Sequence, residues 1–445
     1  MITLILISFL LCLITLKFAG VAAFSFSIFI LTIGIFLCCI NKYSKKDAFI
    51  VYGITFIYYV SFALIHYLSI SKYNIFVYPD EAYFFKTMVD IGAKDSVSDI
   101  FIEIYRSSYN YGNPGYITYL GTVGLVLKNM FGSFNEMSAF LSSVLFGTLA
   151  SVVMFNLLHL YSIKQPLLCA VLFMLFSPFS EFSVVLLRDI HIAFFYLCGF
   201  YIILKPYSIK NILLLFLLTI AIWQFRMEHG LFFIVFIIYY LYISFIRYRV
   251  ILIPFGIIFG LTLIPFYFGF ITEALSNYTL YSDRQSTIGL GIQDDSLSRF
   301  IFAMPHPFRE LLSLIDQQLQ PFPPYYFIIS SDNVYQQIFG ILSVLYSTFW
   351  FVVIFSTIKL ILFNKSLKYL SSNMRLLLFI VLIFLIANTS EINVRRVMCV
   401  YPIIYFIYLI MNNNLSIATT KNAKIYGIVI YISINIFYVV LKYSI

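Results

Sequence analysis

Long runs of apolar residues separated by short polar turns dominate this chain. Ile, Phe, Leu and Tyr fill blocks of about 16–25 residues with almost no charged residues, close to the roughly 20 residues that a helix needs to cross a bilayer. Backbone groups in lipid must be satisfied within their own segment, so each block is predicted to be a helix. We expect thirteen spanning blocks, at 2–16, 19–40, 48–70, 137–161, 167–186, 190–204, 211–225, 230–246, 250–271, 338–363, 376–390, 397–411 and 425–441.

The composition indicates the same class of protein. Of the 445 residues, 62% are hydrophobic and 11% are charged, which is more apolar surface than one or two soluble cores could bury. The predicted fold class is therefore all-α, a polytopic integral membrane protein with a single transmembrane domain over residues 1–445. The first block lacks a basic leader region and a small-residue cleavage site, so we interpret it as a retained helix.

The side of the membrane assigned to each charged turn depends on how a shorter apolar segment at 116–131 is placed. If it lies along the membrane surface as a juxtamembrane helix, one set of turns holds fourteen basic residues against the single acid Asp47. The positive-inside rule then makes that side cytoplasmic. This distribution, rather than nucleic-acid binding, accounts for the net charge of +9. The basic residues are Lys42, Lys45, Lys46, Lys164, Lys205, Lys210, Arg247, Arg249, Lys359, Lys365, Lys368, Arg375, Lys421 and Lys424.

Two long loops are predicted on the opposite, external side. The first covers 71–136 and includes the juxtamembrane helix, and the second covers 272–337. The other turns are only a few residues long, and long loops held by a rigid membrane domain are where chemistry is expected.

The first external loop carries an adjacent carboxylate pair, Asp80 and Glu81. Two neighbouring carboxylates repel each other, so one can keep a proton near neutral pH, which suits a general base or a cation ligand. The alternative is an acidic loop that is simply solvated.

Arginines on the external side run against the charge bias. Arg188, Arg226, Arg395 and Arg396 all lie in turns predicted to share a side with the carboxylate pair. Guanidinium groups match phosphate oxygens bidentately, so arginines that converge near a bilayer surface indicate a lipid-pyrophosphate site. Alternatively, Arg188 with Asp189 and Arg226 with Glu228 form local ion pairs.

The remaining candidate groups are less specific. The second loop contains His306, Arg309 and several glutamines among prolines and aromatic residues, a composition that suits sugar binding or a covering lid. His306 and His229 are lone histidines that could equally be structural hydrogen-bonding groups. All six cysteines fall inside or at the edge of apolar blocks, so no disulfide framework or zinc site is predicted.

Four short motifs, in this order, resemble the GT-C superfamily of polytopic glycosyltransferases, most closely over residues 76–230. They are Asp80-Glu81; Asn113-Pro114-Gly115-Tyr116 at the start of a surface helix that ends at Phe131-Gly132; Ser177-Pro178 before Leu187-Arg188-Asp189; and Arg395-Arg396 followed by Tyr401-Pro402. Within that superfamily the chain looks most like Wzy-type O-antigen or capsule repeat-unit polymerases. Two helices before the one that leads into the acidic loop favour a polymerase, and the lack of a soluble carboxyl-terminal domain excludes an oligosaccharyltransferase-like architecture.

The resemblance implies transfer of a glycan from undecaprenyl pyrophosphate to another lipid-linked repeat unit, at the periplasmic face of a bacterial inner membrane. It also implies roles for single residues, and it leaves open a divalent cation at the carboxylate pair and a chain-length regulator protein as a partner. The implied proton acceptor is Asp80 or Glu81, the pyrophosphate ligands are Arg188, Arg226, Arg395 and Arg396, and the further substrate contacts are Tyr83, His229, His306 and Arg309.

Two other functions stay open at the level of sequence. One is a transferase that adds a single sugar from a polyprenyl-phosphate donor to a glycan or lipid. The other is a flippase for lipid-linked oligosaccharides. Transporters often carry charges within interrupted midplane helices, whereas this chain places its charges at helix ends, which favours an enzyme.

Overall fold

All the regular elements of the computed structural model are helices. It describes residues 2–106, 113–244, 301, 304–305, 307–320, 323–325, 328–329, 333–389 and 394–444, and no strand occurs among them. Seven helical segments in this part of the chain are long and apolar enough to cross a membrane, which supports the predicted class of helical membrane protein. They are α1 (Ile2–Cys39), α2 (Lys45–Tyr73), α6 (Glu136–Leu160), α11 (Met227–Ser244), α16 (Val334–Leu362), the run Val394–Asn413 and α20 (Ile417–Ser444).

Four shorter apolar helices match further predicted blocks. They are α7 (Pro166–Phe176), α9 (Asp189–Ile203), α10 (Ile209–Phe225) and α17 (Ser372–Ala387). The run at 394–413 divides into α18 (Val394–Val397), the short helix η3 (Met398–Val400) and α19 (Tyr401–Asn413). Residues 250–271, the ninth predicted span, lie outside the described residues.

The first helix is a hairpin that contains both of the first two predicted blocks. Gly20 has φ of 80°, a backbone conformation in which a side chain would be strained. The Thr15 and Ser27 hydroxyls, twelve positions apart, lie 3.2 Å from each other. A straight helix would separate them by about 18 Å. The chain therefore turns back at Gly20, and blocks 2–16 and 19–40 are separate segments.

The prediction of one continuous span at 167–186 is wrong. α7 ends at Phe176, and Pro178 begins the five-residue helix α8 (Pro178–Phe182). Proline cannot donate the next backbone hydrogen bond and disfavours helical geometry at the residue before it, and Ser177 is accordingly extended. The eleven residues of α7 extend only about 17 Å, short of a hydrocarbon core of about 30 Å.

The first long loop is largely helical, which the sequence analysis recognised only in its last part. α3 (Pro79–Gly92) and α4 (Val97–Arg106) precede α5 (Pro114–Phe131), which is the predicted surface helix and ends at Gly132. α3 and α5 pack so closely that a Cβ on Gly92 would lie 2.9 Å from the backbone of Gly124. The three helices share a small core of their own, formed by Ile91, Ile100, Ile104, Ile117 and Leu125.

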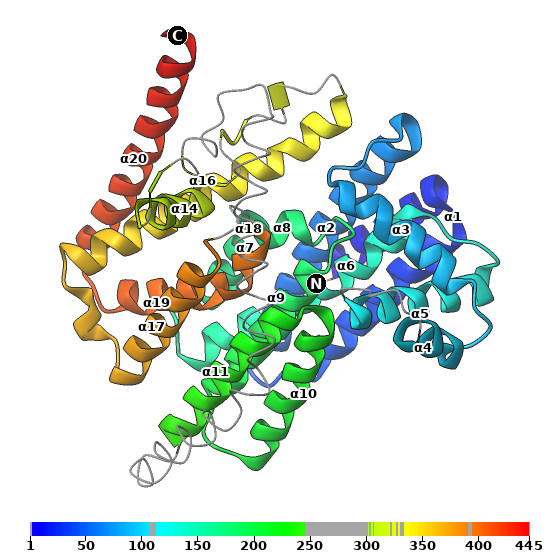
Figure 1. The fold of residues 1–445 in the computed structure, drawn as a ribbon, viewed down its shortest axis with the longest axis horizontal. Helices are drawn as coiled ribbons and strands as arrows, with labels where there is room; N and C mark the ends of the chain where they lie inside the picture. The colour runs from blue at the N-terminus through cyan, green and yellow to red at the C-terminus, as the bar shows by residue number, and fades with distance from the viewer. Residues whose placement is uncertain are drawn as a thin grey trace.

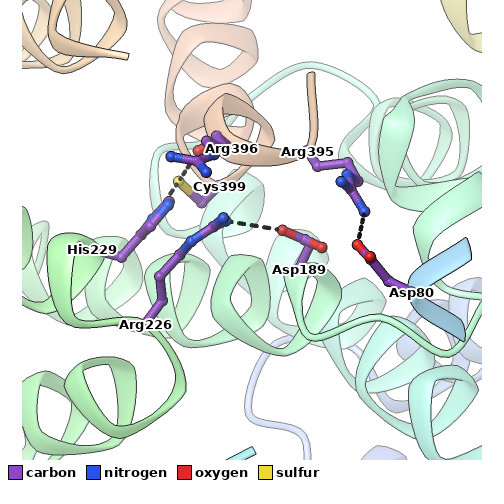
Figure 2. A network of polar contacts seen from close by, with 7 residues as sticks. All are labelled: Asp80, Asp189, Arg226, His229, Arg395, Arg396 and Cys399. Atoms are coloured by element: carbon purple, nitrogen blue, oxygen red, sulfur yellow. Dashed lines mark hydrogen bonds and ion pairs between the residues drawn. The ribbon is translucent and has the colours of Figure 1, made fainter. Parts of the chain in front are cut away.

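Turns predicted to share a side of the membrane do meet in space. At one end, the lysine end, Lys164 donates to the Asn413 carbonyl and Lys359 to the Asn422 carbonyl. At the other, the arginine end, ion pairs join the start of α3 to α18, and the start of α9 to the turn between α10 and α11 (Figures 1 and 2).

The second long loop is described only in part. Residues 272–300 and His306 lie outside the described residues. Its regular element is α14 (Phe308–Leu319), which packs beside α16 and α17 (Figure 1).

The predicted sidedness can be tested with cysteine labelling of cells. Cys39 is exposed at the lysine end, and Asp95 is exposed in the turn between α3 and α4. A membrane-impermeant maleimide should label an Asp95→Cys, Cys39→Ser variant in intact cells, and should label wild-type Cys39 only after the membrane is permeabilised. Labelling of Cys39 in intact cells, with Asp95→Cys protected, would reverse the topology.

Candidate anion-binding site

The carboxylate pair lies in the first turn of a helix, and its two members face different surroundings. Pro79 opens α3, where a missing backbone N–H costs nothing. Tyr78 precedes it, and its backbone N–H donates to Glu81 Oε1 at 2.9 Å. This arrangement closes the start of the helix and turns Glu81 inward, while Asp80 stays on the exposed side.

Glu81 is a structural carboxylate. Its side chain is fully buried, and Oε2 lies 3.0 Å from His66 Nε2 on α2. The same oxygen accepts a hydrogen bond of 3.1 Å from the backbone N–H of Leu186, in the segment after α8. Glu81 therefore connects α2, α3 and that segment, and has no oxygen left for a substrate.

Asp80 is the accessible member of the pair. Its side chain is 56% exposed and lies 3.1 Å from Arg395 Nη1, whose side chain is 24% exposed (Figure 2). The Arg395 guanidinium also lies 5.5 Å from the centre of the Tyr78 ring, a cation–π distance. Asp80 and Arg395 are 315 residues apart in the sequence, so their contact confirms that these two turns meet.

A second ion pair lies deeper. Arg226, between α10 and α11, donates from Nη1 to Asp189 Oδ1 at 3.2 Å, and both side chains are buried. Asp189 lies between Arg226 and Arg395 in Figure 2. The alternative of local ion pairs, Arg226 with Glu228 and Arg188 with Asp189, does not match this geometry, because Asp189 bonds Arg226.

Arg188 carries a charge without a direct partner. Its side chain forms no ion pair or hydrogen bond within the described part of the chain, although Asp189 and Glu228 lie near enough to act on it. Burial, together with the neighbouring positive charges of Arg226 and Arg396, lowers the pKa of Arg188 to about 10. It stays protonated at neutral pH, so the cationic side chains of Arg188, Arg226 and Arg396 lie close together. We call these three residues the arginine cluster.

His229 lies in the protein interior beneath these arginines. It is 3% exposed, and its Nδ1 lies 3.6 Å from the thiol of Cys399 (Figure 2). The Tyr196 hydroxyl donates to its backbone carbonyl at 2.8 Å. The predicted role of His229 as a substrate contact does not fit this position, which instead joins α11 to η3.

Three further residues were predicted to contact the substrate, and the structure places them differently with respect to the arginine cluster. Tyr83 is exposed on α3, one turn after Asp80, where it could meet a ligand. Arg309 lies at the start of α14 and pairs with its neighbour Glu310 at 3.5 Å, apart from the other arginines. His306 lies outside the described residues.

The side chains at Asp80 and Glu81 do not fit a divalent cation. The two carboxylates do not converge, because Asp80 faces Arg395 and the Glu81 oxygens are taken by His66 and two backbone N–H groups. Within the described ranges no group of three or more His, Cys, Asp or Glu residues could hold a metal ion.

Glu181, on α8, is a buried acid that the sequence analysis missed. It accepts hydrogen bonds from the Tyr78 hydroxyl and, at 3.0 Å, from the Ser343 hydroxyl on α16. Burial, together with the Glu181 charge, raises the pKa of Tyr78 well above its ordinary value, so this hydroxyl stays a donor. A lone acid inside the apolar block 167–186 was the available signal, since such residues are rarely accidental.

No protein-family model, curated protein or solved structure matches this chain. The geometry at the arginine end is therefore the basis for assigning a function.

Unequal roles for the two carboxylates predict unequal effects on stability. Glu81→Ala should lower the free energy of unfolding by about 1–3 kcal/mol, because buried partners lose their acceptor. Asp80→Ala should cost less than about 1 kcal/mol, because its ion pair is largely solvent-exposed. Thermal unfolding of both variants in detergent, against wild type, measures the difference. Equal losses would contradict the division.

Proposed function

We propose that this protein is a glycosyltransferase that polymerises undecaprenyl-pyrophosphate-linked repeat units into O-antigen or a related surface polysaccharide. Its place would be the periplasmic face of the bacterial inner membrane. The observation that carries the proposal is Arg188, an arginine that has no direct partner among the described residues and lies close to Arg226 and Arg396 at one end of an apolar helical bundle.

Such an arrangement is unfavourable without an anion. Like charges repel in surroundings of low dielectric constant, and a buried guanidinium without a partner loses hydration that nothing replaces. A phosphate group supplies oxygens in the planar geometry that guanidinium groups bind bidentately. Arg226 and Arg396 add positive charge around Arg188, whereas its acidic neighbours among the described residues are Glu228 and Asp189, which already pairs with Arg226.

The surroundings suit a lipid carrier rather than a soluble phosphate. The helices that present the arginines are apolar over most of their length, and Arg395 on α18 contacts Asp80 at the start of α3. A polyprenyl chain could lie in the bilayer against these helices while its pyrophosphate enters the cluster. The positive charge would then meet the leaving group of the reaction.

The proposed step is a substitution at the anomeric carbon of the donor. A sugar hydroxyl of the acceptor forms the new C–O bond, and the bond between the anomeric carbon and the pyrophosphate oxygen breaks. The pyrophosphate leaves with the electron pair, and the arginines stabilise the charge that develops on it. Asp80 takes the proton of the hydroxyl.

Arg395 connects these two roles. In the structure it pairs with Asp80. A pyrophosphate in the cluster would compete for Arg395, which would leave Asp80 free to accept a proton only when the donor is present. Proton abstraction would thus be tied to donor binding.

Arg188→Ala tests the proposal most cleanly, because it breaks no ion pair or hydrogen bond with any residue that the structure describes. We expect the variant to accumulate normally in the membrane and to lose long polysaccharide chains, as should Asp80→Asn. The measurement is the surface-polysaccharide ladder on a gel, in a deletion strain that carries each variant. Arg106→Ala, an exposed arginine on α4, is the matched control and should restore the full ladder.

The form of the defect separates the proposal from its alternatives. A polymerase defect would remove the long chains and leave a single repeat unit on the lipid core. A full ladder of altered sugar composition would instead indicate a single-sugar transferase, and a normal ladder from Arg188→Ala and Asp80→Asn would contradict the site.

A further inference from the structure

The helix of the second loop is amphipathic in the opposite sense to a soluble helix. On α14, Phe308 is 61% and Leu311 is 56% exposed, whereas Ser313 and Asp316 are buried. The polar residues thus face the protein and the apolar residues face outward. An outward apolar face suits lipid, and an inward polar face needs partners.

Two glutamines hold this helix against α16 and the end of α17. The indole N–H of Trp350, on α16, donates to Gln318 Oε1 at 3.2 Å. Gln317 donates through its side-chain amide to the carbonyl of Asn388, at the end of α17. An indole can only donate, so the Gln318 oxygen must face Trp350 and its amide nitrogen must point away.

Along this helix, three of the buried polar atoms that lack a hydrogen-bond partner among the described residues lie within six positions of one another. They are Ser313 Oγ, Asp316 Oδ1 and Gln318 Nε2. The other Asp316 oxygen accepts from Gln320 at 3.2 Å, which leaves Oδ1 as the available acceptor. Buried polar groups are almost always paired, and leaving several unpaired on one short helix is costly. A ligand that both donates and accepts hydrogen bonds would satisfy all three.

The same residues connect this helix to the arginine end. The Trp350 ring stacks on Tyr401 with ring centres 3.8 Å apart. Tyr401 begins α19, five residues after Arg396, which belongs to the cluster. The polar face of α14 therefore adjoins the segment that carries the predicted pyrophosphate ligands.

We propose that Ser313, Asp316 and Gln318 form a subsite for the sugar hydroxyls of a glycan substrate. This inference rests on the proposed function, because it supplies the sugar half of a substrate whose phosphate half is assigned to the arginines. Sugar hydroxyls donate to Asp316 Oδ1 and Ser313 Oγ and accept from the Gln318 amide. A phosphate does not fit beside a carboxylate, and a single carboxylate is too few ligands for a divalent cation.

The ionisation of Asp316 supports this role. Burial raises the pKa of this carboxyl to about 6, so at pH 7.5 it is mostly charged. A hydroxyl that donates to a charged oxygen forms a stronger hydrogen bond than one that donates to a neutral oxygen.

The experiment uses tryptophan fluorescence as a binding signal. The chain has two tryptophans, so a Trp223→Phe background leaves Trp350, which contacts Gln318, as the reporter. The probe is the free oligosaccharide repeat unit, released by mild acid from the lipid-linked precursor of the host. Saturable binding should be about tenfold weaker in Asp316→Asn and in Ser313→Ala, the loss expected for one hydrogen bond to a charged group or in a dry site.

Folding and specificity have their own controls. Ser313→Ala removes a hydroxyl that has no hydrogen-bond partner among the described residues, and Asp316→Asn keeps an oxygen that can accept from Gln320, so melting temperatures at pH 7.5 should not fall. Leu311→Ala, on the outward face of the same helix, should bind the oligosaccharide as wild type does.

The possible results separate the subsite from the proposed function. Weaker binding in Asp316→Asn and Ser313→Ala, with Leu311→Ala unchanged, supports the subsite. Equal binding in all variants, or no binding to the wild type, overturns it. The polysaccharide ladder of the deletion strain tests the proposed function independently. If Arg188→Ala and Asp80→Asn lose the long chains while all the α14 variants bind the oligosaccharide equally, only the subsite is rejected.

Discussion

Charged groups at the ends of apolar helices constrain this protein more than any other feature. Arg226 and Asp189 form a buried pair where little water is available, and Arg395 and Asp80 form a more exposed pair across segments far apart in the sequence. These contacts bring helix ends together that packing of apolar surfaces alone would not orient. Arg188 has no direct partner among the described residues. A surplus cation is unfavourable for the fold by itself, which is why we attribute it to a ligand.

A second layer of buried acids holds the accessible residues in place. Glu81 bonds His66 and the Leu186 backbone, and Glu181 bonds the hydroxyls of Tyr78 and Ser343. Both fix the first turn of α3, on which Asp80 stands. Because this support is buried and hydrogen-bonded, Asp80 is presented from a rigid position although it is itself exposed. Rigid support beneath an exposed reactive group is the arrangement that positional catalysis requires.

The sequence allowed the membrane helices and the meeting of the arginine turns to be predicted, because block length and charge sidedness record the lipid environment directly. The break at Pro178 and the start of α3 at Pro79, followed by two acids, had local signals that went unused. The division of labour between Asp80 and Glu81 had none. It depends on His66 and on a backbone N–H 105 residues away, which only the tertiary structure brings near.

The central claim is that the arginine cluster binds a lipid-linked pyrophosphate, and a direct binding measurement tests it best. Purified protein in detergent is titrated with farnesyl pyrophosphate, a short polyprenyl pyrophosphate, by calorimetry, beside the Arg188→Ala, Arg396→Ala double variant. We predict saturable binding that weakens with added salt, and at least about a tenfold loss in the double variant, since each charge-assisted contact contributes about 1.5–3 kcal/mol. Equal affinity in both proteins would contradict the account.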